Sequence, residues 1–171
     1  METLKAKIRH VPDFPKPGIL FYDITTLLRD RSGFADAVDC LVKPFQGTAI
    51  DVVIGIESRG FILGAAVAHR LGAGFVPVRK AGKLPSRTVK ATYDLEYGSD
   101  SLEIHADAME SGQRVLIIDD LLATGGTARA TVDLVRQTGG QVLGLGFLIE
   151  LAGLNGRSRL RDENVFVALT Y

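Results

Sequence analysis

A run of small and hydroxyl-bearing residues follows a pair of adjacent carboxylates in the second half of the chain. The apolar stretch 115–118 leads into Asp119 and Asp120, and the loop 123–127 that follows reads Ala-Thr-Gly-Gly-Thr. Small residues let a backbone wrap around an anion, the N–H groups at the start of a helix carry partial positive charge, and threonine hydroxyls donate hydrogen bonds. The pattern predicts a phosphate site, formed by Ala123, Thr124, Gly125, Gly126 and Thr127.

The two aspartates serve a different group from the loop, because carboxylates repel phosphate. Carboxylates beside a phosphate site suit the vicinal hydroxyls of a sugar, or cations carried on a diphosphate. The loop lacks the lysine of a G-x-x-x-x-G-K-[ST] motif and the spacing of G-x-G-x-x-G, which disfavours nucleoside triphosphate and dinucleotide ligands. The aspartate pair alone could simply solvate a strand end, and the glycines alone could simply make a turn. The two together, in one string, favour a binding site.

Two more groups of residues bring positive charge. Ser58 and Arg59 stand between a strand end and a helix start, where backbone N–H groups and a guanidinium can hold an anion. The alternative is that Ser58 only caps the helix while Arg59 is solvated. Arg79, Lys80 and Lys83 concentrate charge farther along, where the alternative is an ordinary basic loop.

Five short apolar runs are typical of strands buried on both faces of a sheet. They are residues 52–56, 75–78, 115–118, 142–149 and 165–169. Apolar residues at helical spacing, with glycine at or just after the end, predict helices over Gly60–Leu71 and Thr127–Thr138. This alternation predicts parallel strands joined by right-handed crossovers, and therefore a doubly wound α/β fold. Ser32 is expected to cap a further helix toward Lys43, ended or kinked by Pro44.

Two stretches interrupt the alternation. Residues 12–18 hold three prolines and a glycine, which excludes a helix or a central strand and predicts an ordered arm leading into residues 19–22. Residues 80–112 lack the helix expected after a parallel strand and carry two short alternating pieces, at 88–95 and 101–104. A long excursion at such a place is more often a functional lid or hairpin than a neutral insertion.

Composition limits the classes of protein that fit. The chain has 171 residues, 46% of them apolar, which suits one domain spanning residues 1–171. Twenty basic residues balance twenty acidic ones, so no overall field favours nucleic acid or an anionic membrane. The single cysteine, Cys40, fits an inert core thiol and a reducing compartment, and no leader or membrane span is evident, so a cytoplasmic location is expected. His10, His69 and His105 lack metal-ligand spacing.

The string over 115–128 resembles the signature of the type I phosphoribosyltransferases. Three other segments narrow the resemblance to members of that family that use adenine. They are Pro12–Phe21 with Asp23–Thr25, Glu57–Phe61, and Arg79–Lys80 continuing through Gly82–Pro85 to Tyr93–Gly98. The four segments stand in the family's order from about Arg9 to the C-terminus. Tyr22 departs from the pattern, because familiar members often carry a basic residue there.

The resemblance implies a fold and a reaction. The fold would be a mostly parallel, doubly wound sheet with a small N-terminal hood, whose arm covers about residues 10–25, and a mobile hairpin lid within a flexible catalytic loop of about residues 80–105. The reaction would join adenine to 5-phosphoribosyl 1-pyrophosphate (PRPP), giving AMP and pyrophosphate, as in purine salvage. In the family the residue matching Arg79 can reach the partner subunit's active site, which implies a homodimer.

The resemblance also implies roles for single residues. Asp119 and Asp120 would bind the ribose hydroxyls, and the loop 123–127 would bind the 5'-phosphate. Pyrophosphate would contact Ser58, Arg59, Arg79, Lys80 and Lys83. Adenine would lie between Phe21 and Leu121, with its edge read by the backbone at Leu20 and Tyr22.

Catalysis and metal use follow from the same resemblance. Glu96 would meet adenine at N7 when the lid closes and, with Arg59, would be catalytic. Mg²⁺ would arrive with PRPP and be held through waters near Asp119 and Asp120, with no protein side chain as a direct ligand. The turn would contain a cis peptide between Glu57 and Ser58.

Two other readings stay open at this point. One is a phosphoribosyltransferase for another base, such as orotate or a 6-oxopurine. The other is a ligand-responsive regulator of the same fold, which would need a basic face or an added module to bind nucleic acid.

Overall fold

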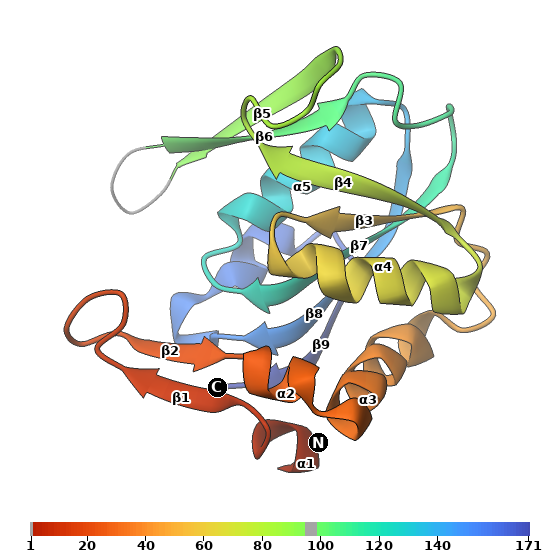
Figure 1. Cartoon of the computed structure of the whole chain (residues 1–171). Helices are drawn as coiled ribbons and strands as arrows, with labels where there is room; N and C mark the ends of the chain where they lie inside the picture. The colour runs from red at the N-terminus through yellow and green to blue at the C-terminus, as the bar shows by residue number, and fades with distance from the viewer. Residues whose placement is uncertain (1, 95–98) are drawn as a thin grey trace.

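A seven-stranded sheet runs through the centre of the protein, as the computed structural model, which describes residues 2–94 and 99–171, shows (Figure 1). The strand order is β5-β6-β4-β3-β7-β8-β9. The strands are β3 (Val52–Ile56), β4 (Gly74–Lys80), β5 (Thr88–Asp94), β6 (Ser99–His105), β7 (Arg114–Leu122), β8 (Gln141–Glu150) and β9 (Val165–Thr170). Strands β4, β3, β7, β8 and β9 pair in parallel, whereas β6 pairs antiparallel with both β4 and β5.

Helices cover both faces of this sheet, which confirms the doubly wound prediction. Helices α3 (Arg31–Val42) and α4 (Arg59–Leu71) pack on one face, and α5 (Gly126–Gln137) packs on the other. Every residue of β3 is buried, as expected for a continuous apolar run between two helical layers. The five predicted strands are confirmed, with ends that differ by a few residues.

Helix α4 lies close against the sheet because glycines face each other across the contact. A Cβ atom on Gly55 of β3 would lie 2.7 Å from the Phe75 ring and 2.8 Å from the backbone oxygen of Gly60. A Cβ on Gly64 would lie 3.1 Å from the Cα of Gly55. Backbone therefore meets backbone here, which brings the first turn of α4 close to the strand ends.

Helix α3 begins differently from the prediction. Its N-cap is Asp30, whose Oδ1 accepts the backbone N–H of Gly33 at 2.7 Å. Ser32 lies inside the first turn and donates its hydroxyl to the same carboxylate at 2.8 Å. The expectation that Ser32 caps the helix was wrong, because the stronger acceptor stands two residues earlier in extended conformation. The helix ends before the short 3-10 turn η1 (Lys43–Phe45), which contains Pro44, as predicted.

The N-terminal part forms a small hairpin below the main sheet (Figure 1). Helix α1 (Glu2–Lys5) precedes strand β1 (Arg9–Pro12), which pairs antiparallel with β2 (Leu20–Asp23), and α2 (Thr25–Arg29) follows. The proline-rich arm joins the two strands outside any helix or central strand, as predicted, and contains a cis bond between Phe14 and Pro15.

The excursion after β4 is the hairpin of β5 and β6. Strand β6 meets β4 at the pairs Arg79–Glu103 and Lys80–Leu102, and the buried Leu102 and Ile104 belong to the core on the α5 side. The two alternating pieces predicted from the sequence are thus confirmed as paired strands over residues 88–94 and 101–104, whereas residue 95 lies outside the described residues. No helix in the described ranges is long and apolar enough to cross a bilayer.

Candidate active site

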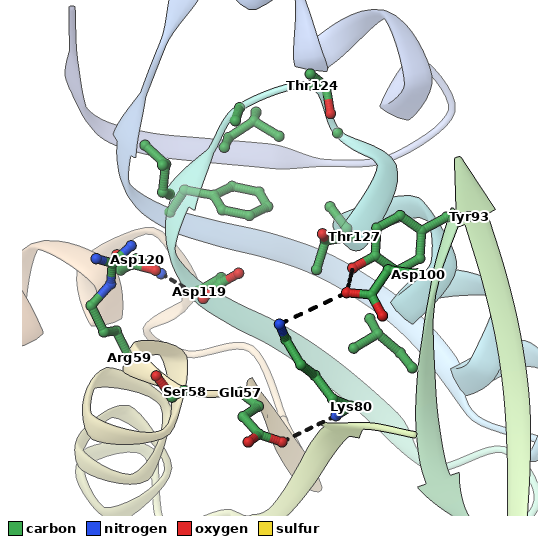
Figure 2. A pocket seen from close by; sticks show the side chains of 17 residues that line it. Glu57, Ser58, Arg59, Lys80, Tyr93, Asp100, Asp119, Asp120, Thr124 and Thr127 are labelled. Carbon is green, nitrogen blue, oxygen red and sulfur yellow. Dashed lines mark hydrogen bonds and ion pairs between the residues drawn. The ribbon is translucent and has the colours of Figure 1, made fainter. Parts of the chain in front are cut away.

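A cleft of about 590 Å³ opens where the parallel strands β3, β4 and β7 end (Figure 2). Crevices outside the carboxyl ends of the strands are where open α/β sheets bind ligands. The cleft is lined by the end of β3 with the first turn of α4, the end of β4, one face of the β5–β6 hairpin, and the end of β7 with the start of α5. Four segments far apart in the sequence thus meet at one place, three of which were predicted to hold anions or sugar hydroxyls.

The two aspartates form the floor of the cleft. Strand β7 continues through them to Leu122, so their side chains point to opposite faces of the sheet. Asp119 accepts the backbone N–H of Asp120 at 2.9 Å on its Oδ1 atom. Asp120 is only 6% exposed and forms an ion pair in which its Oδ2 lies 2.6 Å from Nε of Arg59. This ion pair was not predicted, since nothing in the local pattern aims Arg59 at a carboxylate sixty residues away.

Both carboxylates are held where negative charge is disfavoured. Burial and the charge of Asp120 raise the pKa of Asp119 well above its ordinary value. Burial also raises the pKa of Asp120, although the guanidinium of Arg59 opposes that shift. Hydroxyl groups of a ligand would donate hydrogen bonds to these oxygens and replace the hydration that burial has removed.

The loop after β7 has the geometry of an anion site. Gly125 is the N-cap of α5 and has φ of +81°, a conformation that favours glycine. The first N–H groups of α5 have no partner within the helix, and the helix dipole adds positive potential there. Ala123, Thr124, Gly125 and Thr127 line the cleft, and Gly126 is the buried first residue of the helix. The structure therefore brings the five predicted residues together at one end of the cleft.

The turn between β3 and α4 forms the opposite end. The peptide bond between Glu57 and Ser58 is cis, as the resemblance implied. Ser58 occupies the N-cap position of α4, but its side chain makes no capping hydrogen bond, which disfavours the reading in which it only caps the helix. A Cβ atom on Gly60 would lie 2.6 Å from Oδ1 of Asp119, so glycine lets the turn approach the carboxylate pair.

The basic residues near the cleft are placed differently from one another. Lys80 lines it, and its backbone N–H donates to Oε2 of Glu57 at 3.0 Å. Arg79 donates to both carboxylate oxygens of Glu57, at 3.1 and 3.3 Å, and to the backbone oxygen of Lys83 at 3.0 Å. Burial works to raise the pKa of Glu57, but these hydrogen bonds outweigh it and the pKa is lowered. Arg79 and Lys83 therefore lie beside the cleft, where Glu57 anchors the Arg79 side chain.

The β5–β6 hairpin contributes two residues to which the sequence assigned no role in the site. Tyr93 on β5 and Asp100 on β6 are cross-strand partners, and the Tyr93 hydroxyl donates to Oδ2 of Asp100 at 3.4 Å. Nζ of Lys80 lies 3.8 Å from the same oxygen (Figure 2). Burial and the nearby charge of Asp100 raise the pKa of Tyr93, against a hydrogen bond with Thr127. Cross-strand partners have their side chains on the same face of the sheet, so the register of β5 against β6 places Tyr93 and Asp100 together. The sequence alone does not give this register.

A smaller apolar cavity of about 140 Å³ adjoins the cleft. It is lined by Ile19, Leu20, Phe21, Tyr22, Leu121, Ile149 and Leu151, and it shares Arg59, Asp120 and Leu121 with the larger cleft. All four residues predicted to bind a flat base lie here. The guanidinium of Arg59 lies 5.2 Å from the centre of the Phe21 ring, at the junction of the two cavities.

Aromatic contacts hold the β1–β2 hairpin, which lines this smaller cavity. The rings of Phe14 and Phe21 meet edge to face at 5.1 Å between centroids, and the ring of Tyr22 lies 4.1 Å from that of Tyr171. Tyr22, which also lines the cavity, thus packs its side chain against Tyr171. Glu96, the predicted catalytic acid or base, lies outside the described residues.

The chain matches known proteins over nearly all of its length. Residues 32–170 match the phosphoribosyl transferase domain family. An adenine phosphoribosyltransferase of Acidobacterium capsulatum is 65% identical over 170 residues, which cover 99% of this chain and 94% of that protein. One of Solibacter usitatus is 60% identical over 171 residues, which cover 100% of this chain and 99% of that protein.

Solved structures agree with these sequence matches. The crystal structure of adenine phosphoribosyltransferase from Rhodothermus marinus superposes with a TM-score of 0.95 at 57% identity, covering 99% of this chain and 97% of that one. The Saccharomyces cerevisiae enzyme, complexed with an imino-altritol bisphosphate and adenine, superposes with a TM-score of 0.93 at 45% identity, covering 98% of this chain and 97% of that one.

Proposed function

The chain belongs to the phosphoribosyl transferase family, within it to the adenine phosphoribosyltransferases, and from that premise we propose how its two adjoining cavities carry out the reaction. The enzyme transfers the phosphoribosyl group of PRPP to adenine, giving AMP and pyrophosphate, a step of purine salvage. The observation that carries the proposal is the junction at Arg59 and Asp120, where a polar cleft with a helix N-terminus at each end opens onto an apolar cavity. A sugar carrying two anionic groups fits the first space, and a flat base fits the second.

The 5'-phosphate and ribose occupy the part of the cleft beside α5 in this proposal. The N–H groups of the loop 123–127 and the hydroxyls of Thr124 and Thr127 donate to the phosphate. Asp119 and Asp120 accept hydrogen bonds from the ribose hydroxyls. The partial neutralisation of Asp120 by Arg59 supports this arrangement, because it lets two acids stand close to a ligand that is itself anionic.

Pyrophosphate leaves from the other end of the cleft. Ser58 and Arg59 on the turn, with Lys80 opposite, offer backbone N–H groups and two cations. The reaction breaks the bond from the anomeric carbon to the pyrophosphate oxygen and forms a bond to N9 of adenine. Such a displacement needs placement and neutralisation of anions more than covalent catalysis. We assign Lys83 to the rim, where its charge attracts the diphosphate.

Adenine lies in the apolar cavity between Phe21 and Leu121, with backbone groups of Leu20 and Tyr22 at its edge. Glu96 takes part in proton transfer at the imidazole ring as N9 attacks. Mg²⁺ carried by PRPP would be held through waters near Asp119 and Asp120 and would supply neutralisation of diphosphate charge. The donor set suits a metal that keeps most of its water, because Asp119 and Asp120 are the carboxylates at the floor and Asp120 is already paired.

Turnover of the purified protein tests the proposed function. With PRPP, Mg²⁺ and adenine, AMP and pyrophosphate should form in equal amounts, as measured by chromatography and a pyrophosphate assay. Orotate in place of adenine should give no nucleotide. A protein that binds PRPP but forms no nucleotide with any base would favour the ligand-responsive regulator instead.

The β5–β6 hairpin is proposed to act as a lid over bound PRPP. The basic residues of the segment that leads into this hairpin and of β5, from Lys80 to Lys90, offer trypsin sites. PRPP with Mg²⁺ should slow cleavage there by about tenfold or more, because closure removes the open form that the protease cuts. Fragment masses after timed digestion would measure it. Cleavage after Arg70, at the far end of α4, should stay unchanged. Equal cleavage of the hairpin with and without PRPP would contradict the lid.

We also propose that the enzyme is a homodimer whose interface includes the outer side of α4 and β4. Arg79, which the resemblance places near the partner's site, lies 6.0 Å from the Phe61 ring, and that ring lies 6.2 Å from the ring of Phe75. Phe75 on β4 and Ile62 on α4 are 37% and 46% exposed, which is unusual for large apolar side chains on adjoining elements.

A charged substitution tests the interface. Ile62→Glu should reduce the mass in sedimentation equilibrium from two chains to one chain of 18.4 kDa, because a carboxylate cannot be buried there without a partner. Leu154→Glu is the matched control, since Leu154 is 43% exposed on a different part of the molecule. An unchanged dimer of Ile62→Glu, or loss of the dimer in both variants, would contradict this interface.

A further inference from the structure

A segment near the C-terminus packs directly behind the phosphate loop. It runs from η2 (Ala152–Leu154) to η3 (Gly156–Leu160), and Gly156 is buried although the residues on either side of it are exposed. A Cβ atom on Gly156 would lie 2.3 Å from the backbone oxygen of Ala123 and 3.1 Å from the backbone nitrogen of Gly125. In return, a Cβ on Gly125 would lie 2.4 Å from the backbone oxygen of Gly156. The two backbones are therefore in contact, with no room for a side chain from either.

The residue after Gly156 ties this contact to the sheet. Arg157 donates from Nε to both oxygens of Glu150, at 2.9 and 3.0 Å, and from Nη1 to the backbone oxygen of Val165 at 3.3 Å. Glu150 is buried at the end of β8, where it pairs in register with Leu122, the last residue before the phosphate loop. Both segments thus start from the same pair of strand ends, and Arg157 fixes how far Gly156 stands from the loop.

We propose that Gly156 is a positioning residue for the 5'-phosphate site, which it supports from behind through the backbone of Ala123 and Gly125. The inference rests on the proposed function and adds to it a residue that touches no substrate. The N–H groups of the loop bind an anion only if their peptide planes face the cleft. A side chain at position 156 would push the Ala123 carbonyl and turn those planes.

The conformation of Gly156 separates this role from ordinary backbone strain. Gly156 is not among the residues with positive φ, so alanine can adopt its backbone conformation. The obstacles to its methyl group are the backbone of the loop and Cδ1 of Leu122, which would lie 3.0 Å away. Gly153, three residues earlier, is exposed, and a methyl group added to it would meet nothing within 4 Å. Gly153→Ala is therefore a matched control for the same change in the same segment.

The experiment compares two ligands that use different ends of the cleft. Ribose 5-phosphate needs the loop 123–127, and pyrophosphate with Mg²⁺ needs the turn at Ser58. Gly156→Ala should raise the dissociation constant for ribose 5-phosphate by about 10- to 100-fold, because displacement of binding groups by about 1 Å has effects of that size. KM for PRPP should rise by a similar factor. Titration calorimetry should give dissociation constants for pyrophosphate and adenine within about twofold of the unchanged protein. Gly153→Ala should match the unchanged protein throughout.

Each outcome bears on the proposal. Equally weakened binding of ribose 5-phosphate and pyrophosphate, or unchanged binding of both, would overturn the proposal. Arg157→Lys is the second variant if Gly156→Ala does not fold, because lysine keeps the charge beside Glu150 but cannot make both contacts of the guanidinium. Arg157→Lys should weaken the binding of ribose 5-phosphate more than that of pyrophosphate. An equal loss of affinity for both ligands would again overturn the proposal. Absence of turnover in the unchanged protein would instead refute the proposed function.

Discussion

Adenine should be used at least about 10⁴-fold more efficiently than hypoxanthine or guanine, as judged by kcat/KM with saturating PRPP, because the apolar cavity is expected to read the base through backbone groups. In an extended strand such as β2, the C=O of Leu20 and the N–H of Tyr22 lie on the same edge. Adenine presents an amino donor beside an N1 acceptor and matches this pair. The 6-oxopurines present a carbonyl beside a protonated N1, which sets acceptor against acceptor and donor against donor.

Phe21→Ala tests whether the backbone or the ring sets this preference. The substitution removes stacking, so KM for adenine should rise, yet hypoxanthine should remain as poor a substrate as before. Nucleotide formation with each base, followed by chromatography, gives both ratios. Comparable turnover of adenine and hypoxanthine by the unchanged protein would contradict backbone reading while leaving the phosphoribosyl site intact.

Asp119→Asn should lower kcat/KM for PRPP by about 10²-fold, because an amide replaces a charged acceptor of ribose hydroxyl groups. The same substitution should raise the melting temperature. Burial and Asp120 raise the pKa of Asp119 in the folded protein above that of the unfolded chain. Stability from this carboxyl is therefore present below the unfolded pKa and is lost as pH rises through the folded pKa, so the charged form of the carboxyl opposes folding. Asparagine removes that charge.

The pairing of lower activity with higher stability separates a role in binding from damage to the fold. Melting curves at pH 7 and pH 5 should show a smaller gain at pH 5, where the native carboxyl is closer to its protonated form. KM for adenine should change less than KM for PRPP. The exposed Asp107→Asn, in the turn after β6, is the control and should alter neither property. A lower melting temperature of Asp119→Asn, or an equal rise of KM for PRPP and adenine, would contradict the role of Asp119 in binding ribose.

The sequence allowed prediction of those parts of the site that lie within one continuous segment. Apolar runs fix the parallel strands, and because strand ends in such a sheet share one edge, Asp119 and the loop after it could be placed beside Ser58 without a structure. Tyr22, which departs from the family pattern, packs its ring on that of Tyr171 and also lines the apolar cavity. Cys40 is partly buried on α3, where burial raises the pKa of its thiol, in keeping with the expected inert side chain.

The remaining features depend on which residues distant in sequence come together. Asp100 reaches the cleft only because β6 pairs with β5 and β4 in a particular register, and Arg59 turns to Asp120 only because α4 lies close to the sheet. Capping was misjudged at Ser32 because Asp30 competes for the same amide. Gly156 could not be found from the sequence, since a glycine that supports a loop from behind looks like any glycine in a turn.

The close approach of Gly60 to Asp119 has a consequence for the length of molecule that the enzyme accepts. On one side the turn proposed to bind pyrophosphate rests against the strand end at Gly60, and on the other the loop proposed to bind the 5'-phosphate rests against backbone at Gly156. Both contacts involve backbone atoms, so we expect the two ends of the cleft to keep a fixed separation. A sugar diphosphate with one more carbon between its two anionic ends would satisfy the amides at one end and miss those at the other. We therefore expect the separation of the two anionic ends to select a five-carbon sugar in addition to the hydroxyl contacts proposed for Asp119 and Asp120.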